Sequence, residues 1–325
     1  MRDISARIRT GTLPAAKPVS VDHRIHVTFE HLRGLEGAAK GLRFLPHQPA
    51  RSVLNGRHVS RLRGRGLNFE ELRDYMPSDD VRSIDWKVTA RTGKPYVRVF
   101  TEERDRPTLI VVDQRMSMFF GSRLNTKAVT AAECAALAAF AVLAQGDRVG
   151  GIVFGDAALA EVKPARNRAA LNRFLTALSA ANQALAPDAP AVEPLSINEV
   201  LGAVTRIAPR NHLVIFLSDF DVIDDQTRRL VSGLSRHNDL VLGLVTDPFA
   251  DDLPADAKLV ISDGVLQAAV DMSDQTVHHD LAHFAKRRIA KILEWQLQFG
   301  VPVLPLTTAQ DSLAQMRRLM GLGRA

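Results

Sequence analysis

With one cysteine in 325 residues, the chain cannot form a disulfide within itself. Cys134 falls inside the apolar stretch "TAAECAALAAFAVLAQ", which predicts a buried helix, so we interpret it as a core thiol rather than a nucleophile. No run reaches the roughly 18 uncharged apolar residues of a membrane span. Residues 1–17 lack the apolar centre of a signal peptide. These absences predict a cytoplasmic protein with no membrane span.

Sequence motifs of the common enzyme classes are also missing. There is no GxxxxGK[ST] phosphate loop, no GxSxG nucleophile turn and no Cys/His arrangement with metal-ligand spacing. Paired carboxylates could do acid–base work, but they need a cleft and shifted pKa values, which a sequence does not show. We therefore expect a protein that is not an enzyme.

The basic excess of the chain lies entirely in its N-terminal third. The net charge is +6, and residues 1–105 hold 20 Lys and Arg against 13 Asp and Glu, or +7. The densest part is "NGRHVSRLRGRG", with Arg61, Arg63 and Arg65 among glycines. Nucleic-acid binding is one interpretation, but aromatic interleaving and a known module are absent. A solvated arginine-rich turn that faces acidic groups is commoner, and we favour it.

The pattern along the chain predicts three parts. Residues 1–55 are expected to be an N-terminal lead-in, flexible over "GTLPAAKPVSVDHR", with one amphipathic helix in "TFEHLRGLEGAAKGL" that would either pack on the larger domain or bind another molecule. Residues 56–106 hold a basic turn, a short acidic helix and a strand. In residues 107–325, apolar runs such as "TLIVVD" and "HLVIFLSD" alternate with helical stretches and with a hairpin, "KLVISDGVLQAAV". This alternation predicts an α/β domain with a doubly wound, mostly parallel sheet.

Two of the expected strands end in an aspartate, Asp113 and Asp219. Ligands of doubly wound sheets bind beyond the carboxyl ends of the strands, where the strand order reverses. If the two strands are neighbours there, both carboxylates enter one crevice, which suits a hard cation such as Mg²⁺. The alternative is that each aspartate caps the helix or turn that follows it.

The segment "DQRMSM" after the first of these strands resembles the DxSxS signature of von Willebrand factor A domains. That resemblance implies a metal-ion-dependent adhesion site made by Asp113, Ser117 and Asp219, together with a threonine from a later loop. Arg115 stands where the middle serine belongs, and a guanidinium offers no lone pair to a metal. Ser196 is nearest to the threonine position, but Ser196 and Glu199 already form a capping box. We therefore expect a degenerate site, in which Arg115 replaces the cation by pairing with Asp113 or Asp219.

The stretch "RDYMPSDDVRSIDW", residues 73–86, is dense in charge. We expect a turn and then a short helix whose start is made acidic by Asp79 and Asp80, with Trp86 as a large anchor. Its other charged residues, Arg82 and Asp85, would either pair with the preceding arginines in an internal clasp or contact another protein. We favour the clasp, because mixed charges on a helix are usually structural or solvated.

From "GRGLNFEELRDYMPSDDVRSIDW" onward, the chain closely resembles the bacterial domain of unknown function 58 family. The resemblance implies a von Willebrand A-like domain and an association with MoxR-type AAA+ ATPases. We therefore expect a non-catalytic adaptor that acts with such an ATPase on an unknown client protein. Two alternatives stay open: a nucleic-acid-binding protein, and a metal-dependent hydrolase that uses Asp113 and Asp219.

Overall fold

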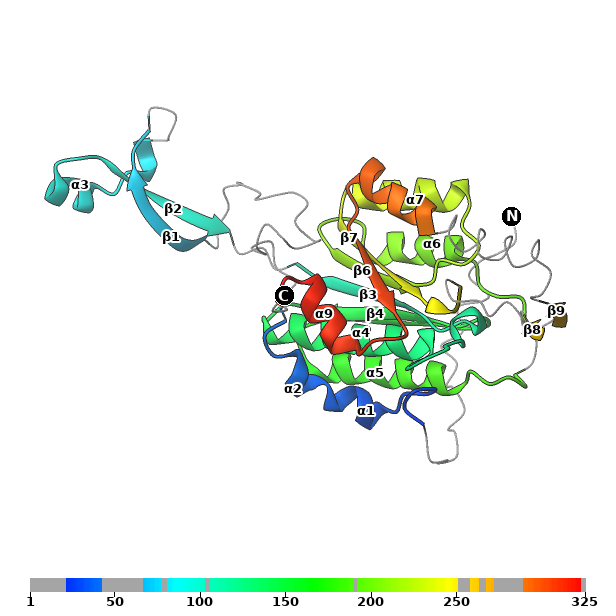
Figure 1. Ribbon diagram of the computed structural model, residues 1–325. Coiled ribbons are helices and arrows are strands. Elements are labelled where there is room, and N and C mark those ends of the chain that lie inside the picture. The colour runs from blue at the N-terminus through cyan, green and yellow to red at the C-terminus, as the bar shows by residue number, and fades with distance from the viewer. Residues whose placement is uncertain are drawn as a thin grey trace. The chain divides into compact units, whose positions relative to one another are not determined.

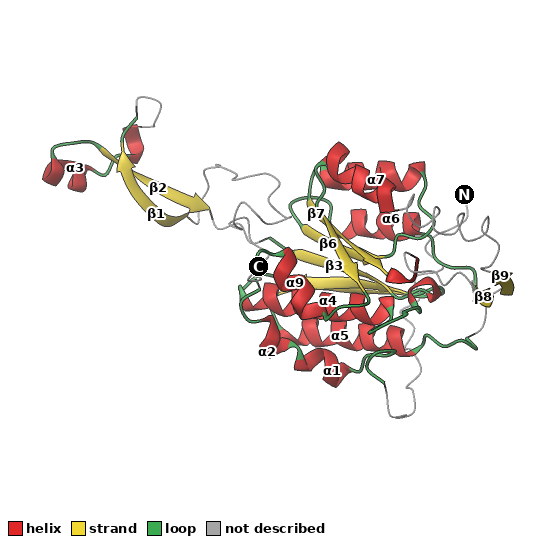
Figure 2. Cartoon of the chain, viewed as in Figure 1, coloured by secondary structure: helices red, strands yellow, loops and turns green. Residues whose placement is uncertain are grey.

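The chain divides into two compact units, residues 57–105 and the remainder, which are described separately. Figure 1 shows the computed structural model, and Figure 2 shows the same view coloured by secondary structure. The structure describes residues 22–42, 67–76, 81–102, 106–189, 192–250, 258–262, 267–271 and 289–322.

The larger unit is built on a six-stranded sheet with the order β10-β7-β6-β3-β4-β5. Five of these strands are parallel, and the edge strand β5 runs antiparallel to β4. This confirms the α/β class and the mostly parallel sheet. The strands are β3 (Thr108–Asp113), β4 (Val149–Phe154), β5 (Leu159–Ala165), β6 (Leu213–Ser218), β7 (Asp239–Thr246) and β10 (Val303–Thr307).

Helices cover both faces of the sheet, which explains why its strands read as continuous apolar runs. Alternate residues of β3 enter different cores: Ile110 and Val112 pack on one face, and Leu109 and Val111 on the other. The first face is covered by α4 (Lys127–Ala144), α5 (Arg168–Gln183) and α9 (Ser312–Leu319). The second is covered by α6 (Ile197–Ile207), α7 (Asp225–Ser235) and helical residues 289–299.

Helix α4 is the one helix in the described ranges with the length and apolar composition of a membrane span. In this fold 78% of it is buried inside the unit, against the sheet and α5. Cys134 lies on this helix and is fully buried, and burial raises the pKa of its thiol. The core position therefore accounts for the composition of α4 and for the cysteine.

Residues 22–42 pack on the core of the larger unit, which was one of the two alternatives left open for the amphipathic helix. The single amphipathic helix expected here is two short helices, α1 (Phe29–Gly34) and α2 (Glu36–Ala39). Val27 and Leu32 are fully buried in the core on the α4 side. Asn182 accepts the Val27 backbone N–H at 2.7 Å. Residues 1–21 and 43–55 of the expected lead-in lie outside the described residues.

The smaller unit is a two-stranded antiparallel sheet, β1 (Leu67–Asp74) and β2 (Tyr96–Glu102), with helical turns between the strands. These turns are a 3-10 turn, η2 (Val81–Ser83), and α3 (Trp86–Thr92).

In the larger unit, the hairpin expected after β7 is present as β8 (Lys258–Ser262) and β9 (Gln267–Asp271). The helix before β10 is described from residue 289 to residue 299.

Close packing of α5 on β4 depends on a glycine. A Cβ atom at Gly151 would overlap the ring of Phe174 and lie 2.8 Å from the carbonyl oxygen of Ile110. We predict that Gly151→Ala lowers the free energy of unfolding by about 1–3 kcal/mol, because the ring has to shift within a packed core. Urea denaturation measures this change.

The matched control is Gly202→Ala in α6, where a Cβ atom meets nothing within 4 Å. This change should raise the free energy of unfolding by about 0.5–1 kcal/mol, the helical preference of alanine over glycine. Equal effects of the two substitutions would contradict the described packing of α5 on β4.

Candidate functional site

The site lies where the strand order reverses, at the carboxyl ends of the adjacent parallel strands β3 and β6. Asp113 ends β3 and Asp219 directly follows β6. Both side chains are buried, with 0% and 1% of their surface exposed. The predicted juxtaposition of these two strand ends is therefore present, and the site must compensate two carboxylates that are removed from water.

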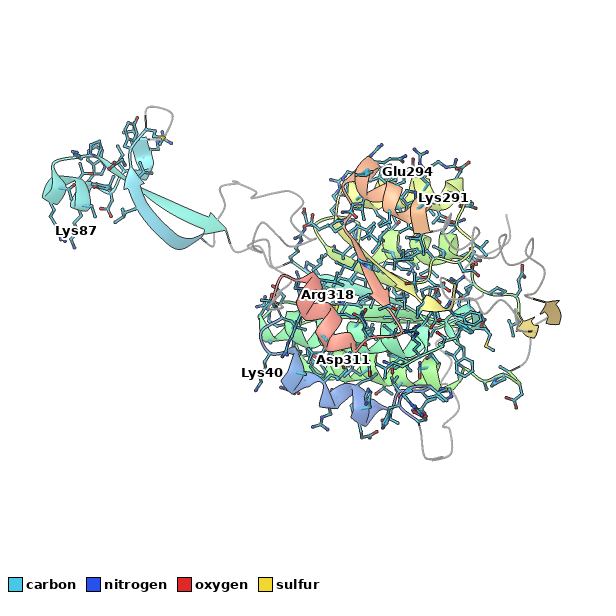
Figure 3. All side chains as sticks on the ribbon, viewed as in Figure 1. Lys40, Lys87, Lys291, Glu294, Asp311 and Arg318 are labelled. Carbon is cyan, nitrogen blue, oxygen red and sulfur yellow. The ribbon has the colours of Figure 1, made fainter. Side chains whose placement is uncertain are left out.

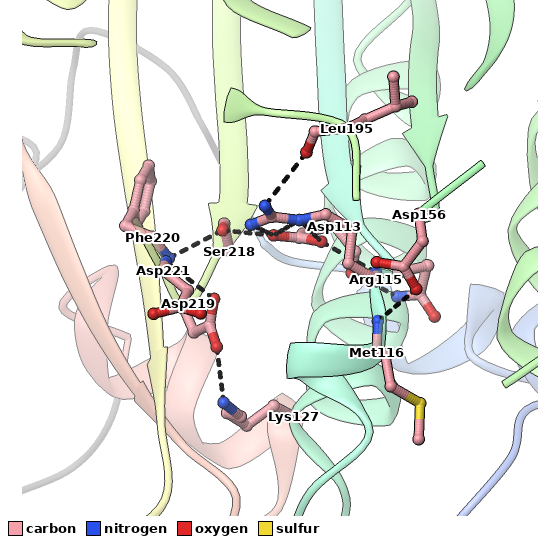
Figure 4. Close-up of polar contacts among 11 residues, drawn as sticks. Asp113, Arg115, Met116, Lys127, Asp156, Leu195, Ser218, Asp219, Phe220 and Asp221 are labelled. Atoms are coloured by element: carbon pink, nitrogen blue, oxygen red, sulfur yellow. Dashed lines mark hydrogen bonds and ion pairs between the residues drawn. The ribbon is translucent and has the colours of Figure 1, made fainter. Parts of the chain in front are cut away.

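Arg115 provides the compensation for Asp113 (Figure 4). Its backbone N–H and its Nε both donate to Asp113 Oδ1 at 3.0 Å, and its Nη2 donates to Oδ2 at 2.8 Å. A third guanidinium nitrogen, Nη1, donates to the carbonyl oxygen of Leu195 at 3.2 Å. The guanidinium carbon lies 5.5 Å from the centre of the Phe154 ring, within cation–π range. Arg115 and Asp113 thus form a bidentate ion pair, in which two guanidinium nitrogens donate to the two carboxylate oxygens.

Ser218 joins the two strand ends. Its hydroxyl donates to Asp113 Oδ2 at 2.7 Å and accepts the backbone N–H of Phe220 at 2.8 Å. Phe220 is fully buried and has a φ of +52°, which is rare for a residue other than glycine. The Asp113 carboxylate therefore also holds the turn that follows β6.

Asp219 forms an ion pair with Lys127. The Lys127 ammonium lies 2.6 Å from Asp219 Oδ2, and the backbone N–H of Asp221 donates to Oδ1 at 3.1 Å. Lys127 is the first residue of α4, where it is positioned by the N-cap Thr126, and its side chain is 11% exposed. Lys127 could not be predicted as a site residue, because a lysine at the start of a helix carries no signal of its own in the sequence.

The remaining polar groups extend the site toward β4. The backbone N–H of Met116 donates to Asp156 at 2.9 Å. Burial raises the pKa of Asp156, although the Met116 N–H and Arg115 lower it. Ser117 lies in a 3-10 turn, η3 (Met116–Met118), and its buried hydroxyl oxygen has no hydrogen-bond partner in the part of the chain described. The Ser196–Glu199 capping box predicted from the sequence is confirmed.

The electrostatics favour a charged Arg115. Burial lowers the pKa of Arg115, but Asp113, Asp219 and Asp221 outweigh that effect and raise it. Burial raises the pKa of Asp113, which Arg115 and Ser218 oppose. A guanidinium that makes two hydrogen bonds to one buried carboxylate is the strongest form of this pairing.

The expected ligand oxygens do not fit a divalent cation in this arrangement. Both oxygens of Asp113 accept hydrogen bonds from Arg115, and those of Asp219 accept from Lys127 and from a backbone N–H. The two positive charges of Arg115 and Lys127 therefore contact the oxygens that would have to ligate the metal. No group of three or more His, Cys, Asp or Glu side chains arranged to hold a metal occurs among the described residues.

Two residues of the charged cluster in the smaller unit are described at the start of α3. Asp85 is buried and caps this helix, accepting the backbone N–H of Lys87 at 3.0 Å. The helix begins at Trp86, which is 64% exposed. Arg82 is exposed on η2. The other predicted members lie outside the described residues: Asp79, Asp80, Arg61, Arg63 and Arg65.

Comparison with known proteins places this arrangement in a family. The family model described as "Protein of unknown function DUF58" matches residues 71–290. The chain is 30% identical over 291 residues to "Uncharacterized protein Rv1480" of Mycobacterium tuberculosis (strain ATCC 25618 / H37Rv), covering 89% of this chain and 90% of the relative. The same values hold for "Uncharacterized protein Mb1516" of Mycobacterium bovis. The chain belongs to the DUF58 family.

Arg115→Ser tests the compensation of the buried carboxylate. The substitution leaves Asp113 without its counter-charge, so we predict a loss of about 3–5 kcal/mol in the free energy of unfolding. Urea denaturation measures the loss.

Two controls accompany this variant. Arg123→Ser, at an exposed arginine of the same loop, should cost less than about 1 kcal/mol. The double variant Asp113→Asn/Arg115→Met removes both charges but keeps a hydrogen-bonding side chain beside Ser218 and the backbone N–H of residue 115, so it should recover part of the lost stability. A single-variant loss no larger than that of Arg123→Ser would show that the pair does not hold the site together.

Proposed function

We propose that this protein is a non-catalytic adaptor that recognises another protein through a von Willebrand A-like domain. The support from the fold is the placement of Asp113 and Asp219 on adjacent strands at the point of reversal, where such sheets bind their ligands. The support from the sequence is the resemblance of "DQRMSM" to an adhesion-site signature.

One observation carries the proposal: the two buried carboxylates are already paired with cations of the chain. Arg115 neutralises Asp113, and Lys127 neutralises Asp219. A hydrolase that relied on these aspartates would need their oxygens for a metal or a proton, and here hydrogen bonds occupy them. The paired arrangement suits a rigid surface for recognition, because it fixes the loops at the strand ends without a metal.

The partner that we propose is a cytoplasmic MoxR-type AAA+ ATPase. The ATPase would supply energy from nucleotide hydrolysis, and this chain would select or present a client protein during maturation or assembly of another complex. The support is the family membership together with the association that the sequence resemblance implies.

Independence from metal can be measured directly. We predict that metal-stripped wild-type protein shows no micromolar Mg²⁺ binding in titration calorimetry, because Arg115 and Lys127 repel the ion. Arg115→Ser removes one positive charge and restores a hydroxyl, so it should bind Mg²⁺ more tightly than the wild type. If the wild type binds Mg²⁺ with micromolar affinity, the ion pairs of Arg115 and Lys127 do not replace a metal.

The partner can be sought by affinity capture from the native cytoplasm, with nuclease and a non-hydrolysable ATP analogue present. We predict that the wild type recovers an AAA+ ATPase, identified by mass spectrometry. Recovery of nucleic acid without an ATPase when nuclease is omitted would refute the adaptor function.

Two variants, used in the same affinity capture, test whether the exposed tryptophan of the smaller unit contacts the ATPase. Loss of the ATPase with Trp86→Ser, but not with Leu297→Ser, would assign the contact to the smaller unit. Trp86 and Leu297 are 64% and 87% exposed, so neither change should disturb the core.

A further inference from the structure

Exposed apolar side chains gather at the carboxyl ends of the strands. The segments that connect elements there are 114–126, 155–158, 184–189, 192–196, 219–224, 247–250 and 308–311, which together are called the strand-end surface. Eight large apolar side chains are exposed in the described part of the larger unit, and four of them lie on this surface: Phe120, Leu124, Val192 and Val222. Phe120 also stacks edge-to-face on Phe249, with ring centres 5.6 Å apart.

Lys127 connects two of the loops that carry these side chains. Its backbone N–H donates to the carbonyl oxygen of Phe120 at 2.8 Å, and its ammonium pairs with Asp219, three residues before Val222. The loops that carry Phe120 and Val222 are therefore both attached to the Lys127–Asp219 ion pair.

The strand-end surface is also acidic. Its described segments hold eight carboxylates and two arginines, a balance of −6: Asp156, Asp188, Glu193, Asp219, Asp221, Asp224, Asp247 and Asp311 against Arg115 and Arg123. The connecting segments at the opposite ends of the strands hold five arginines and one aspartate, a balance of +4: Arg106, Arg148, Arg166, Arg210 and Arg236 against Asp147. The acidity thus belongs to one end of the sheet and not to the unit as a whole.

Val222 has a backbone conformation that is rare for its residue type. Its φ is +56°, in the left-handed region that β-branched residues avoid, and its side chain is 82% exposed. A glycine would adopt this conformation without strain. Strained backbone of this kind concentrates at ligand-binding segments.

We infer that the strand-end surface binds a segment of a partner protein in which a lysine or arginine is flanked by an apolar residue. The apolar side chain would pack against Val222 and Phe120, and the basic group would face the carboxylates around Asp221. Charge complementarity selects this occupant, because an acidic or purely apolar segment would gain nothing from a surface of this charge. The inference rests on the proposed function and specifies the chemistry of the partner.

The test is a selection of random twelve-residue peptides displayed on phage against the immobilised full-length protein. We predict enrichment of peptides with Lys or Arg beside an apolar residue. Individual peptides are then measured by fluorescence anisotropy. Binding should weaken about tenfold in Asp221→Asn/Val222→Gly, from the loss of one partly exposed charge pair and one aliphatic contact. It should also weaken as salt is added.

The control variant is Glu294→Gln/Leu297→Ser, which removes one charge and one apolar side chain from exposed positions on helical residues 289–299 (Figure 3). This variant should bind the selected peptides like the wild type. Thermal unfolding checks that both double variants are folded. The left-handed position of residue 222 accepts glycine, so the first variant should retain its fold.

Three outcomes would overturn the inference. They are enrichment of acidic peptides, enrichment of peptides that bind the strand-end variant and the wild type equally, and no enrichment at all. If the selection fails while affinity capture recovers the ATPase, the adaptor function stands and this surface is not its peptide site. If the selection succeeds while capture recovers no ATPase, the surface binds as inferred and the proposed partner is wrong.

Discussion

The site depends on the need to compensate one buried charge, the carboxylate of Asp113. An ionised carboxylate removed from water costs several kcal/mol unless charge and hydrogen bonds compensate it. Arg115 and Ser218 supply both. Through them the carboxylate also fixes neighbouring loops: Arg115 reaches the Leu195 carbonyl, and Ser218 holds the left-handed turn at Phe220. One ion pair thus orders the loops after β3 and β6 and before α6.

Building the cations into the chain gives the surface a fixed charge pattern. Arg115 and Lys127 are positioned by the loop after β3 and by the start of α4, so they do not depend on an ion from solution. Because Arg115 and Lys127 offset only two of the carboxylates, the other acidic groups give that end of the sheet its net negative charge. Under the proposed function, recognition would be set by side chains alone and would not change with metal concentration.

The sequence predicted the features that depend on local pattern. Runs such as "TLIVVD" predict strands buried on both faces, and parallel strands place Asp113 and Asp219 at the same end of the sheet. That the two strands are neighbours came from the structure. Features that depend on tertiary contacts were missed. Lys127 becomes a partner of Asp219 only after folding, because the two residues are 92 positions apart in the chain. The packing of the short helices α1 and α2 likewise comes from the core they join.

The most direct test of the built-in ion pair is a crystal structure of the wild type soaked in Mn²⁺, with anomalous data collected near the manganese absorption edge. The account predicts that Arg115 remains on Asp113 and that no anomalous peak lies within reach of Asp113, Ser117 or Asp219. A peak at about 2.2 Å from these oxygens, with the guanidinium displaced, would contradict it.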